Sequence, residues 1–296
     1  RHTQQLLAGG AIAGVLVATA YGVHLLRDDP RYLDEFEDVD ALVAQLNAES
    51  RVGDAVFIDE PITTQIFMNW LKTPTLAATL NYPPDLSENN EPPTGLANRY
   101  VLDWTAARYD RLWLVASTSP FDTTKVRPIE RYLVENYYPV REIETSPRAR
   151  AILFYAGADP TDAPTEETNA RFGESIRLNG YTMFGDRTYA PGAMLPLTLF
   201  WEVDSSPAMD YNIGIFVLDN AGNTVVQRDS QPQATFGYMT RWTPGNIYPD
   251  NHALHLDLSE GAYEVVLAVY DWRDGSRLSV EGGGDTLPLG TINIER

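Results

Sequence analysis

The stretch LPLTLFWEV, Leu195–Val203, places a large apolar residue at every second position, which is the period of a half-buried β-strand. The same period holds from residue 172 to the end of the chain, in short segments separated by turn residues such as Pro191-Gly192 and Asp274-Gly275. Residues 172–296 are therefore predicted to form an antiparallel β-sandwich. The predicted strands are Ile176–Met183, Leu195–Val203, Asn212–Leu218, Thr224–Arg228, Ala253–Leu258, Tyr263–Tyr270, Arg277–Val280 and Leu287–Ile294.

Upstream of this region, residues 158–171 (ADPTDAPTEETNAR) contain few apolar side chains and two prolines. This composition is typical of an exposed connector between domains. We expect a linker here.

Residues 30–157 read as strands that alternate with helices. Helical patterns over 33–50, from residue 61 and over 124–137 alternate with apolar strands at 55–58, 112–116, 140–143 and 151–155. This alternation predicts a small α/β domain, Rossmann-like, with a mainly parallel sheet. The glycine-rich motifs that bind nucleotide phosphates are absent from its sequence, so no cofactor is predicted.

The segment Leu6–Leu26 has 21 residues and no Lys, Arg, Asp or Glu. As a helix it is long enough to cross a bilayer, and residues 1–29 are predicted to be a transmembrane helix with the lipid bilayer as its partner. The small residues Gly10 and Gly14 would let further membrane helices pack closely against it. A signal peptide cleaved after Ala18-Thr19-Ala20 and a buried helix of a soluble domain are the alternatives.

Charge and cysteine content exclude several classes of partner and site. The net charge of −19 argues against nucleic acid as a partner and against anionic lipid as a partner of the soluble part. The chain has no Cys, which excludes disulfides, thiolate zinc sites and Cys nucleophiles.

Two carboxylates, Asp59 and Glu60, follow the first predicted strand, the usual place for a functional carboxylate in an open α/β sheet. The favoured interpretation is an acidic first turn of the helix that begins at Pro61. The pair Asp38 and Asp40 reads better as the solvated face of a helix than as a metal-binding motif.

No metal site is predicted in the sandwich. His252 and His255 are three residues apart on a predicted strand and point to opposite faces. Asp271 and Asp274 suggest a calcium loop, but the ligand spacing fails and a turn accounts for them.

Five aromatic residues are candidates for stacking on sugar rings if they gather on an exposed surface; burial in the core is the competing interpretation. They are Trp201, Tyr211, Trp242, Tyr248 and Trp272.

Several motifs of this chain resemble one known family. In the C-terminal half they are Gly180-Tyr181, Pro191-Gly192, Leu197–Trp201, Gln227–Pro232, Trp242-x-Pro244-Gly245, Asp250-x-His252, Gly261-x-Tyr263 and Tyr270-Asp271 with Arg277-Leu278, preceded by Val52–Ile58, Arg111–Val115 and Ile129-Glu130-x-x-Leu133. This pattern is similar to the C-terminal extracytoplasmic region of bacterial polytopic glycosyltransferases of the dolichyl-phosphate-mannose protein mannosyltransferase-like group.

The resemblance implies a donor sugar linked to polyprenyl phosphate and a catalytic core that lies outside this chain. It predicts an accessory extracytoplasmic part, at the cell membrane, that positions a glycan or protein acceptor or braces the membrane core. It also implies a fragment, so the native product is expected to exceed 33 kDa. The alternatives are an anchored, non-enzymatic surface protein whose sandwich binds carbohydrate or protein, and a separate enzyme centred on Asp59-Glu60.

Overall fold

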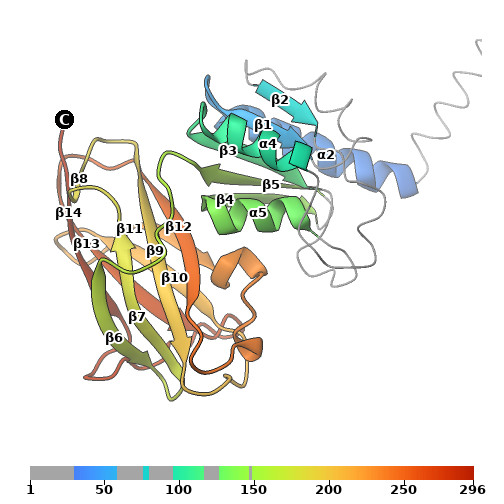
Figure 1. The fold of residues 1–296 in the computed structure, drawn as a ribbon. Helices are drawn as coiled ribbons and strands as arrows, with labels where there is room; N and C mark the ends of the chain where they lie inside the picture. The colour runs from blue at the N-terminus through green and yellow to red at the C-terminus, as the bar shows by residue number, and fades with distance from the viewer. Residues whose placement is uncertain (1–29, 59–75, 80–95, 117–126, 147–148) are drawn as a thin grey trace, which may run out of the picture.

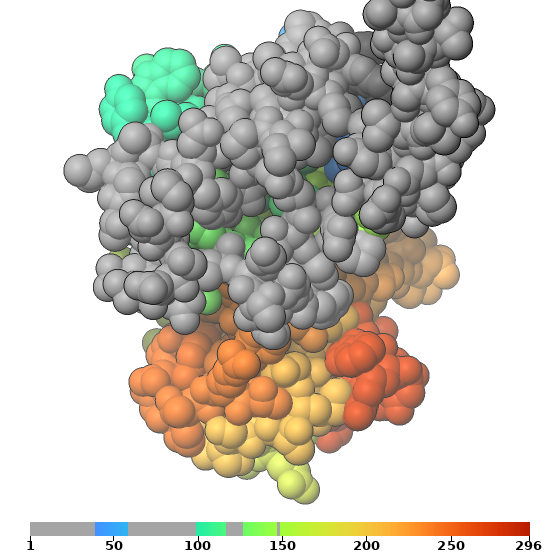
Figure 2. Space-filling model, turned by 90° about the vertical axis from the view of Figure 1, so that its right-hand side faces the viewer, coloured from blue at the N-terminus to red at the C-terminus, as the bar shows by residue number. Residues whose placement is uncertain are grey.

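The computed structural model describes residues 30–58, 76–79, 96–116, 127–146 and 149–296. They form an α/β domain followed by a β-sandwich, which contact each other through β4 and β12 (Figure 1). In the view of Figure 2, residues of the sandwich, coloured yellow to red, form the lower part of the surface.

The α/β domain contains, in chain order, α2 (Pro30–Glu49), β1 (Ala55–Ile58), β2 (Leu76–Thr79), α4 (Leu96–Ala106), β3 (Arg111–Ala116), α5 (Pro128–Asn136), β4 (Tyr138–Ser146) and β5 (Ala149–Tyr155). Apolar residues of α2, such as Leu42 and Leu46, pack on one face of the sheet. Residues of α4 and α5, such as Leu102 and Leu133, pack on the other.

The sheet of this domain has the order β2-β1-β3-β5-β4. β1 is parallel to β2 and β3, but β5 is antiparallel to both β3 and β4. The prediction of a Rossmann-like domain with a mainly parallel sheet was therefore wrong. Only two residues separate β4 from β5, whereas a parallel connection needs a crossover of about a dozen residues.

No helix among the described residues is long and apolar enough to cross a membrane. The segment predicted to form a transmembrane helix, Leu6–Leu26, lies outside the described residues.

The sandwich contains β6 (Glu166–Phe172), β7 (Ile176–Met183), β8 (Thr188–Tyr189), β9 (Ala193–Val203), β10 (Asn212–Leu218), β11 (Thr224–Ser230), the short 3₁₀ helices η1 (Pro232–Thr235) and η2 (Met239–Arg241), β12 (Tyr248–Leu256), β13 (Gly261–Tyr270) and β14 (Leu287–Ile294). One sheet has the order β11-β10-β13-β14-β8 and the other β12-β9-β7-β6. All neighbours in them are antiparallel except β8 and β14.

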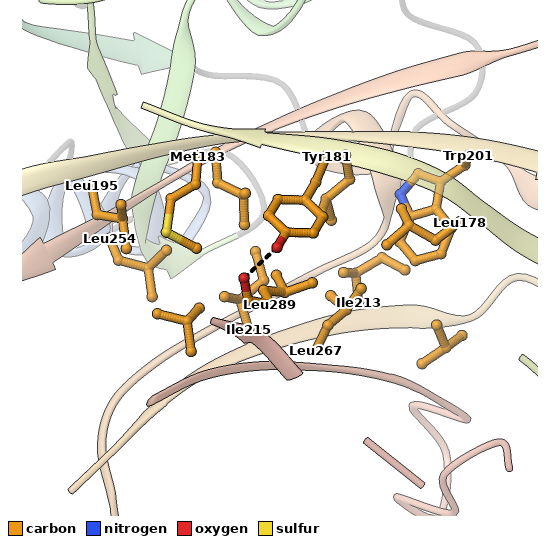
Figure 3. Close-up of a cluster of buried hydrophobic side chains, with 14 of the residues drawn as sticks. Leu178, Tyr181, Met183, Leu195, Trp201, Ile213, Ile215, Leu254, Leu267 and Leu289 are labelled. Atoms are coloured by element: carbon orange, nitrogen blue, oxygen red, sulfur yellow. Dashed lines mark hydrogen bonds between the residues drawn. The ribbon is translucent and has the colours of Figure 1, made fainter. Parts of the chain in front are cut away.

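The alternating positions of β9 supply the sandwich core. Leu195 and Trp201 face apolar side chains of the opposite sheet, such as Ile213 and Leu267 (Figure 3). The Tyr181 hydroxyl, buried in the same layer, donates a hydrogen bond to the carbonyl of Leu289. Burial of such side chains is the main favourable term for a sheet pair of this kind.

Four strands have the bounds expected from the sequence, namely β1, β7, β10 and β14. β12 begins at Tyr248, five residues before its predicted start, and β6 begins at Glu166, inside the predicted linker. Residues 277–280 form isolated bridges and no strand.

Asp54, at the start of β1, joins the first turn of the domain to β3. Its buried carboxylate accepts hydrogen bonds from the backbone N–H of Arg51 (3.0 Å), from Arg111 Nε (2.7 Å) and from Trp113 Nε1 (2.8 Å). Arg111 Nη2 is a fourth donor, at 3.2 Å. These hydrogen bonds fix the carboxylate, so Asp54 sets the position of β1 against β3.

We expect Asp54→Asn to lower the free energy of unfolding by about 2 kcal/mol, because a neutral amide forms no ion pair with the Arg111 guanidinium and its NH₂ group would face one or more of the donors around it. Urea denaturation measures the change. The control Asp40→Asn alters an exposed residue of α2 and should stay within about 0.5 kcal/mol of the wild type. Equal losses in both variants would contradict the assigned role.

Candidate functional site

The structure separates the predicted site residues. Asp59 and Glu60 lie outside the described residues. Of the five aromatic candidates, Trp201 and Trp242 are buried in the sandwich core, and Trp272 is exposed. The other two, Tyr211 and Tyr248, are partly buried against that core.

Only one pair of these aromatic rings meets. Trp242 stacks on Tyr248 with ring centroids 4.5 Å apart, and Trp201 packs edge-on against Phe172. Their ring faces are thus used inside the domain, so the five residues do not form a common surface for a sugar.

The histidines of β12 also lie apart. His252 is buried at the open edge of the sandwich, and His255 contacts Arg51 of the α/β domain. Asp271 and Asp274 serve a turn: Asp271 accepts from Arg273, and Asp274 accepts from the backbone N–H of Ser276. No group of three metal-ligating side chains occurs in the part of the chain that the structure describes.

A cavity of about 550 Å³ lies between the two domains, and we call it the interdomain groove. It is bordered by β4 of the α/β domain and by β11, η1 and β12 of the sandwich. Its lining residues are Pro139–Glu142, Ile152, Val226–Gln231, Ala234, Thr235 and Ala253–His255. Its volume is within the range of small-ligand and peptide sites.

A buried polar network forms one wall of the interdomain groove. Asp250 Oδ2 lies 2.8 Å from His252 Nε2, and Arg228 Nε donates to His252 Nδ1 at 3.2 Å. Arg228 also donates through Nη1 to the carbonyl of Val140 on β4. One guanidinium therefore connects both sheets of the sandwich to the α/β domain.

These bonds fix the tautomer of His252. Because Nδ1 accepts from Arg228, Nε2 must carry the hydrogen that is donated to Asp250. Both ring nitrogens are thereby engaged, so His252 positions its neighbours and has no free nitrogen for proton transfer.

Val140 is available to Arg228 because of a bulge. The register of β4 against β5 shifts between Pro139 and Arg141, and Val140 is left without a partner in the ladder. A strand that bulges at its edge exposes a carbonyl, and Arg228 satisfies it.

The pKa of Arg228 is lowered to about 10, because burial disfavours its charge and the carboxylates of Asp250, Glu142 and Asp229 compensate in part. Arg228 therefore stays protonated at neutral pH. Its third nitrogen, Nη2, has no hydrogen-bond partner among the described residues, and the side chain lines the interdomain groove.

The η1 segment lines the interdomain groove through Ala234 and Thr235 and has a strained conformation. Gln233, Ala234 and Thr235 have φ angles of 51°, 45° and 78°, a left-handed region that costs side-chain-bearing residues about 1–3 kcal/mol each. Asp250 accepts a hydrogen bond from the backbone N–H of Gln233 (2.6 Å), and Arg127 of the α/β domain donates to Thr235 Oγ1 (3.2 Å).

Behind the β4 wall lies an ionic cluster. Glu130 accepts from Arg127 (2.6 Å) and from Arg150 (3.2 Å), and Arg150 also donates to Glu142. Burial disfavours the charge of Arg150, but Glu130 and Glu142 outweigh it and raise the pKa of Arg150. The cluster holds Glu142 beside the interdomain groove.

A helix end fixes the two domains to each other. The Asn251 side-chain amide donates to the carbonyls of Val134 (3.3 Å) and Glu135 (3.4 Å) in the last turn of α5. The last carbonyls of a helix lack partners within it, so a side chain of β12 caps α5 from the other domain.

Two sequence signals point to this site. Arg228 is a charged residue at an inward position of a predicted strand, and Asp250-x-His252 places two polar residues at inward positions of another. Both segments are among the motifs of the family resemblance, but nothing in the sequence says that they meet.

We expect Arg228→Met to lower the free energy of unfolding by about 2 kcal/mol or more, because it leaves His252 Nδ1 and the Val140 carbonyl without their donor and removes the positive charge that compensates Asp250. The matched control is Arg141→Met, whose side chain is 54% exposed and pairs with Glu49. This control should change stability by about 0.5 kcal/mol or less. Similar urea midpoints for both variants would refute the role of Arg228.

His255 predicts an acid-sensitive contribution to stability. Burial, then the positive charges of Arg51 and Arg111, lower the pKa of His255 below its usual 6.5, against a smaller opposing effect of Asp257. As the pH falls through 6.5, His255 becomes protonated in the unfolded chain but stays neutral in the folded chain. The free energy of unfolding therefore decreases as the pH falls.

The variant His255→Gln, which keeps an acceptor for Arg51, should lose this component. Its free energy of unfolding should fall less than that of the wild type between pH 8 and pH 5. Parallel pH profiles for the two proteins would show that His255 is not responsible.

No family model and no curated protein matches this chain. Among solved structures, it resembles the C-terminal domain of wzt (TM-score 0.31, 10% identity, covering 45% of this chain and 83% of that one). It also resembles the CARDB domain of the PF1109 protein from Pyrococcus furiosus (TM-score 0.26, 7% identity, covering 47% of this chain and 100% of that one). Likenesses at this level identify neither a family nor a function.

Proposed function

We propose that this chain is the accessory, acceptor-holding part of a glycosyltransferase that uses a polyprenyl-phosphate-linked sugar, and that the interdomain groove holds the acceptor. The transferase part of this proposal comes from the sequence motifs quoted above. The binding part is supported by the groove itself.

The observation that carries the binding role is the composition of the interdomain groove. Apolar side chains such as Val226 and Ala253 lie beside a cation, Arg228, and a carboxylate, Glu142. A mostly apolar cavity with a few convergent polar groups is the usual form of a binding site. The groove thus offers both a hydrogen-bond donor and a hydrogen-bond acceptor. This combination suits a ligand with hydroxyl or amide groups, such as a molecule that accepts a sugar.

The firm coupling of the domains also supports a binding role. The contacts of Arg228 with Val140, of Asn251 with the end of α5 and of Arg127 with Thr235 all cross between the domains. A groove between fixed walls loses little conformational entropy when a ligand enters, so it binds more tightly than a hinged one.

The binding role is tested by a substitution that places a large side chain in the interdomain groove. Gln231 lines it and has no side-chain hydrogen bond to the described residues, so Gln231→Trp should place an indole in the cavity without removing a contact. Val225→Trp is the matched control, since Val225 belongs to β11, which Gln231 directly follows, is 41% exposed and does not line the groove.

Binding is measured on an array of short oligosaccharides and on a library of unstructured nonapeptides. We expect the wild type and Val225→Trp to bind members of at least one set, and Gln231→Trp to bind them at least about tenfold more weakly. Equal binding by all three proteins would place the ligand elsewhere and overturn the proposal.

The transferase part is tested separately, by purifying the tagged protein from its source cells and assaying sugar transfer from a polyprenyl-phosphate-linked donor. Transfer activity that co-purifies supports it. Ligand binding without any such activity would instead favour a non-enzymatic binding protein.

A further inference from the structure

Most residues that line the interdomain groove come from three short runs of consecutive residues. β11 and the residue after it contribute six in a row, Val226–Gln231, β4 contributes Pro139–Glu142, and β12 contributes Ala253–His255. Side chains of a strand alternate between its two faces. A cavity that touches consecutive residues therefore touches the edge of the strand, where the main chain is exposed.

Each of these strands is the last one in its sheet. β11 ends one sheet of the sandwich, β12 ends the other, and β4 ends the sheet of the α/β domain. Within the described residues, β11 pairs with β10 alone, and no other backbone hydrogen bond to Val226–Ser230 is present. With respect to the described part of the chain, its outer row of N–H and C=O groups is therefore available to a partner strand.

The side chains around this edge favour a polypeptide over a saccharide. No Phe, Tyr or Trp is among the residues that line the interdomain groove, so a sugar ring has no aromatic face to stack on. Two polar atoms of the groove, Arg228 Nη2 and Glu142 Oε2, have no hydrogen-bond partner among the described residues. Arg228 Nη2 can donate to a backbone carbonyl of a ligand, and Glu142 Oε2 can accept from a backbone N–H.

We propose that the interdomain groove binds an extended polypeptide segment, which adds a strand to the free edge of β11 along Val226–Ser230. At 3.3–3.4 Å per residue, about five residues of the ligand would pair over roughly 17 Å. Main-chain hydrogen bonds would supply affinity, and alternate side chains would face Val226, Ala253 and Leu254. The net charge of −19 favours an uncharged or basic segment. This inference rests on the proposed function and names the acceptor as a protein.

The experiment uses a phage-displayed library of random nonapeptides, selected on the whole chain and counter-selected on Gln231→Trp. An enriched peptide is then synthesised with a single backbone N-methyl group at each position in turn. We expect alternate positions over the paired stretch to lose affinity at least about tenfold and the intervening positions to change less than about twofold, because only alternate N–H groups face β11. Amide hydrogen exchange at residues 226–230 should slow when the unmodified peptide binds.

Affinity losses without the alternating pattern, or protection of other amides, would overturn strand addition. Binding of oligosaccharides but of no peptide would overturn this inference and leave the proposed function standing. Failure of both ligand sets would reject both. Self-association of the chain in sedimentation, with protection at residues 226–230 in the absence of peptide, would assign the edge to a second copy and also refute the proposal.

Discussion

The guanidinium of Arg228 is the contact on which the arrangement of the two domains depends. It lies on β11, reaches His252 on β12 and bonds the carbonyl of Val140 on β4, so it touches the last strand of all three sheets. A charge in this position is costly unless it is fully hydrogen-bonded and balanced. The carboxylate of Asp250 compensates this charge, and His252 bridges the two residues by hydrogen bonds. The polar residues Asp250 and His252 of β12 are therefore as important to the fold as its apolar residues.

The same contact explains why an open groove persists between folded domains. Strand edges normally need protection, by charges, bulges or covering segments. Here β4 carries a bulge at Val140 and β11 an inward-pointing Arg228, and a hydrogen bond from Arg228 to the Val140 carbonyl joins the two edges. The strained η1 segment, held by Asp250 and Arg127, lines the groove through Ala234 and Thr235. Strain that is held in place by surrounding contacts often accompanies a binding site.

Patterns that depend on one element were predictable from the sequence. The alternation of Leu195–Val203 and the turn residues around it predicted antiparallel strands that the structure contains, several of them with the same bounds. The direction of the strands in the α/β domain was not predicted correctly, because alternation of helices and strands was given more weight than the short connection between β4 and β5. That connection length was readable, and it excludes a parallel pair.

The sequence by itself determined the sandwich, the acidic charge and the places where polar residues such as Arg228 and His252 interrupt the apolar face of a strand. Hydrophobic periodicity and turn chemistry act over a few neighbouring residues, so they can be read from the sequence. Only the tertiary structure decided that Trp201 and Trp242 lie in the core, and that Arg228, Asp250 and Val140 meet. Those contacts join residues up to 88 positions apart. They follow from how three sheet edges pack together, and no local pattern encodes that packing.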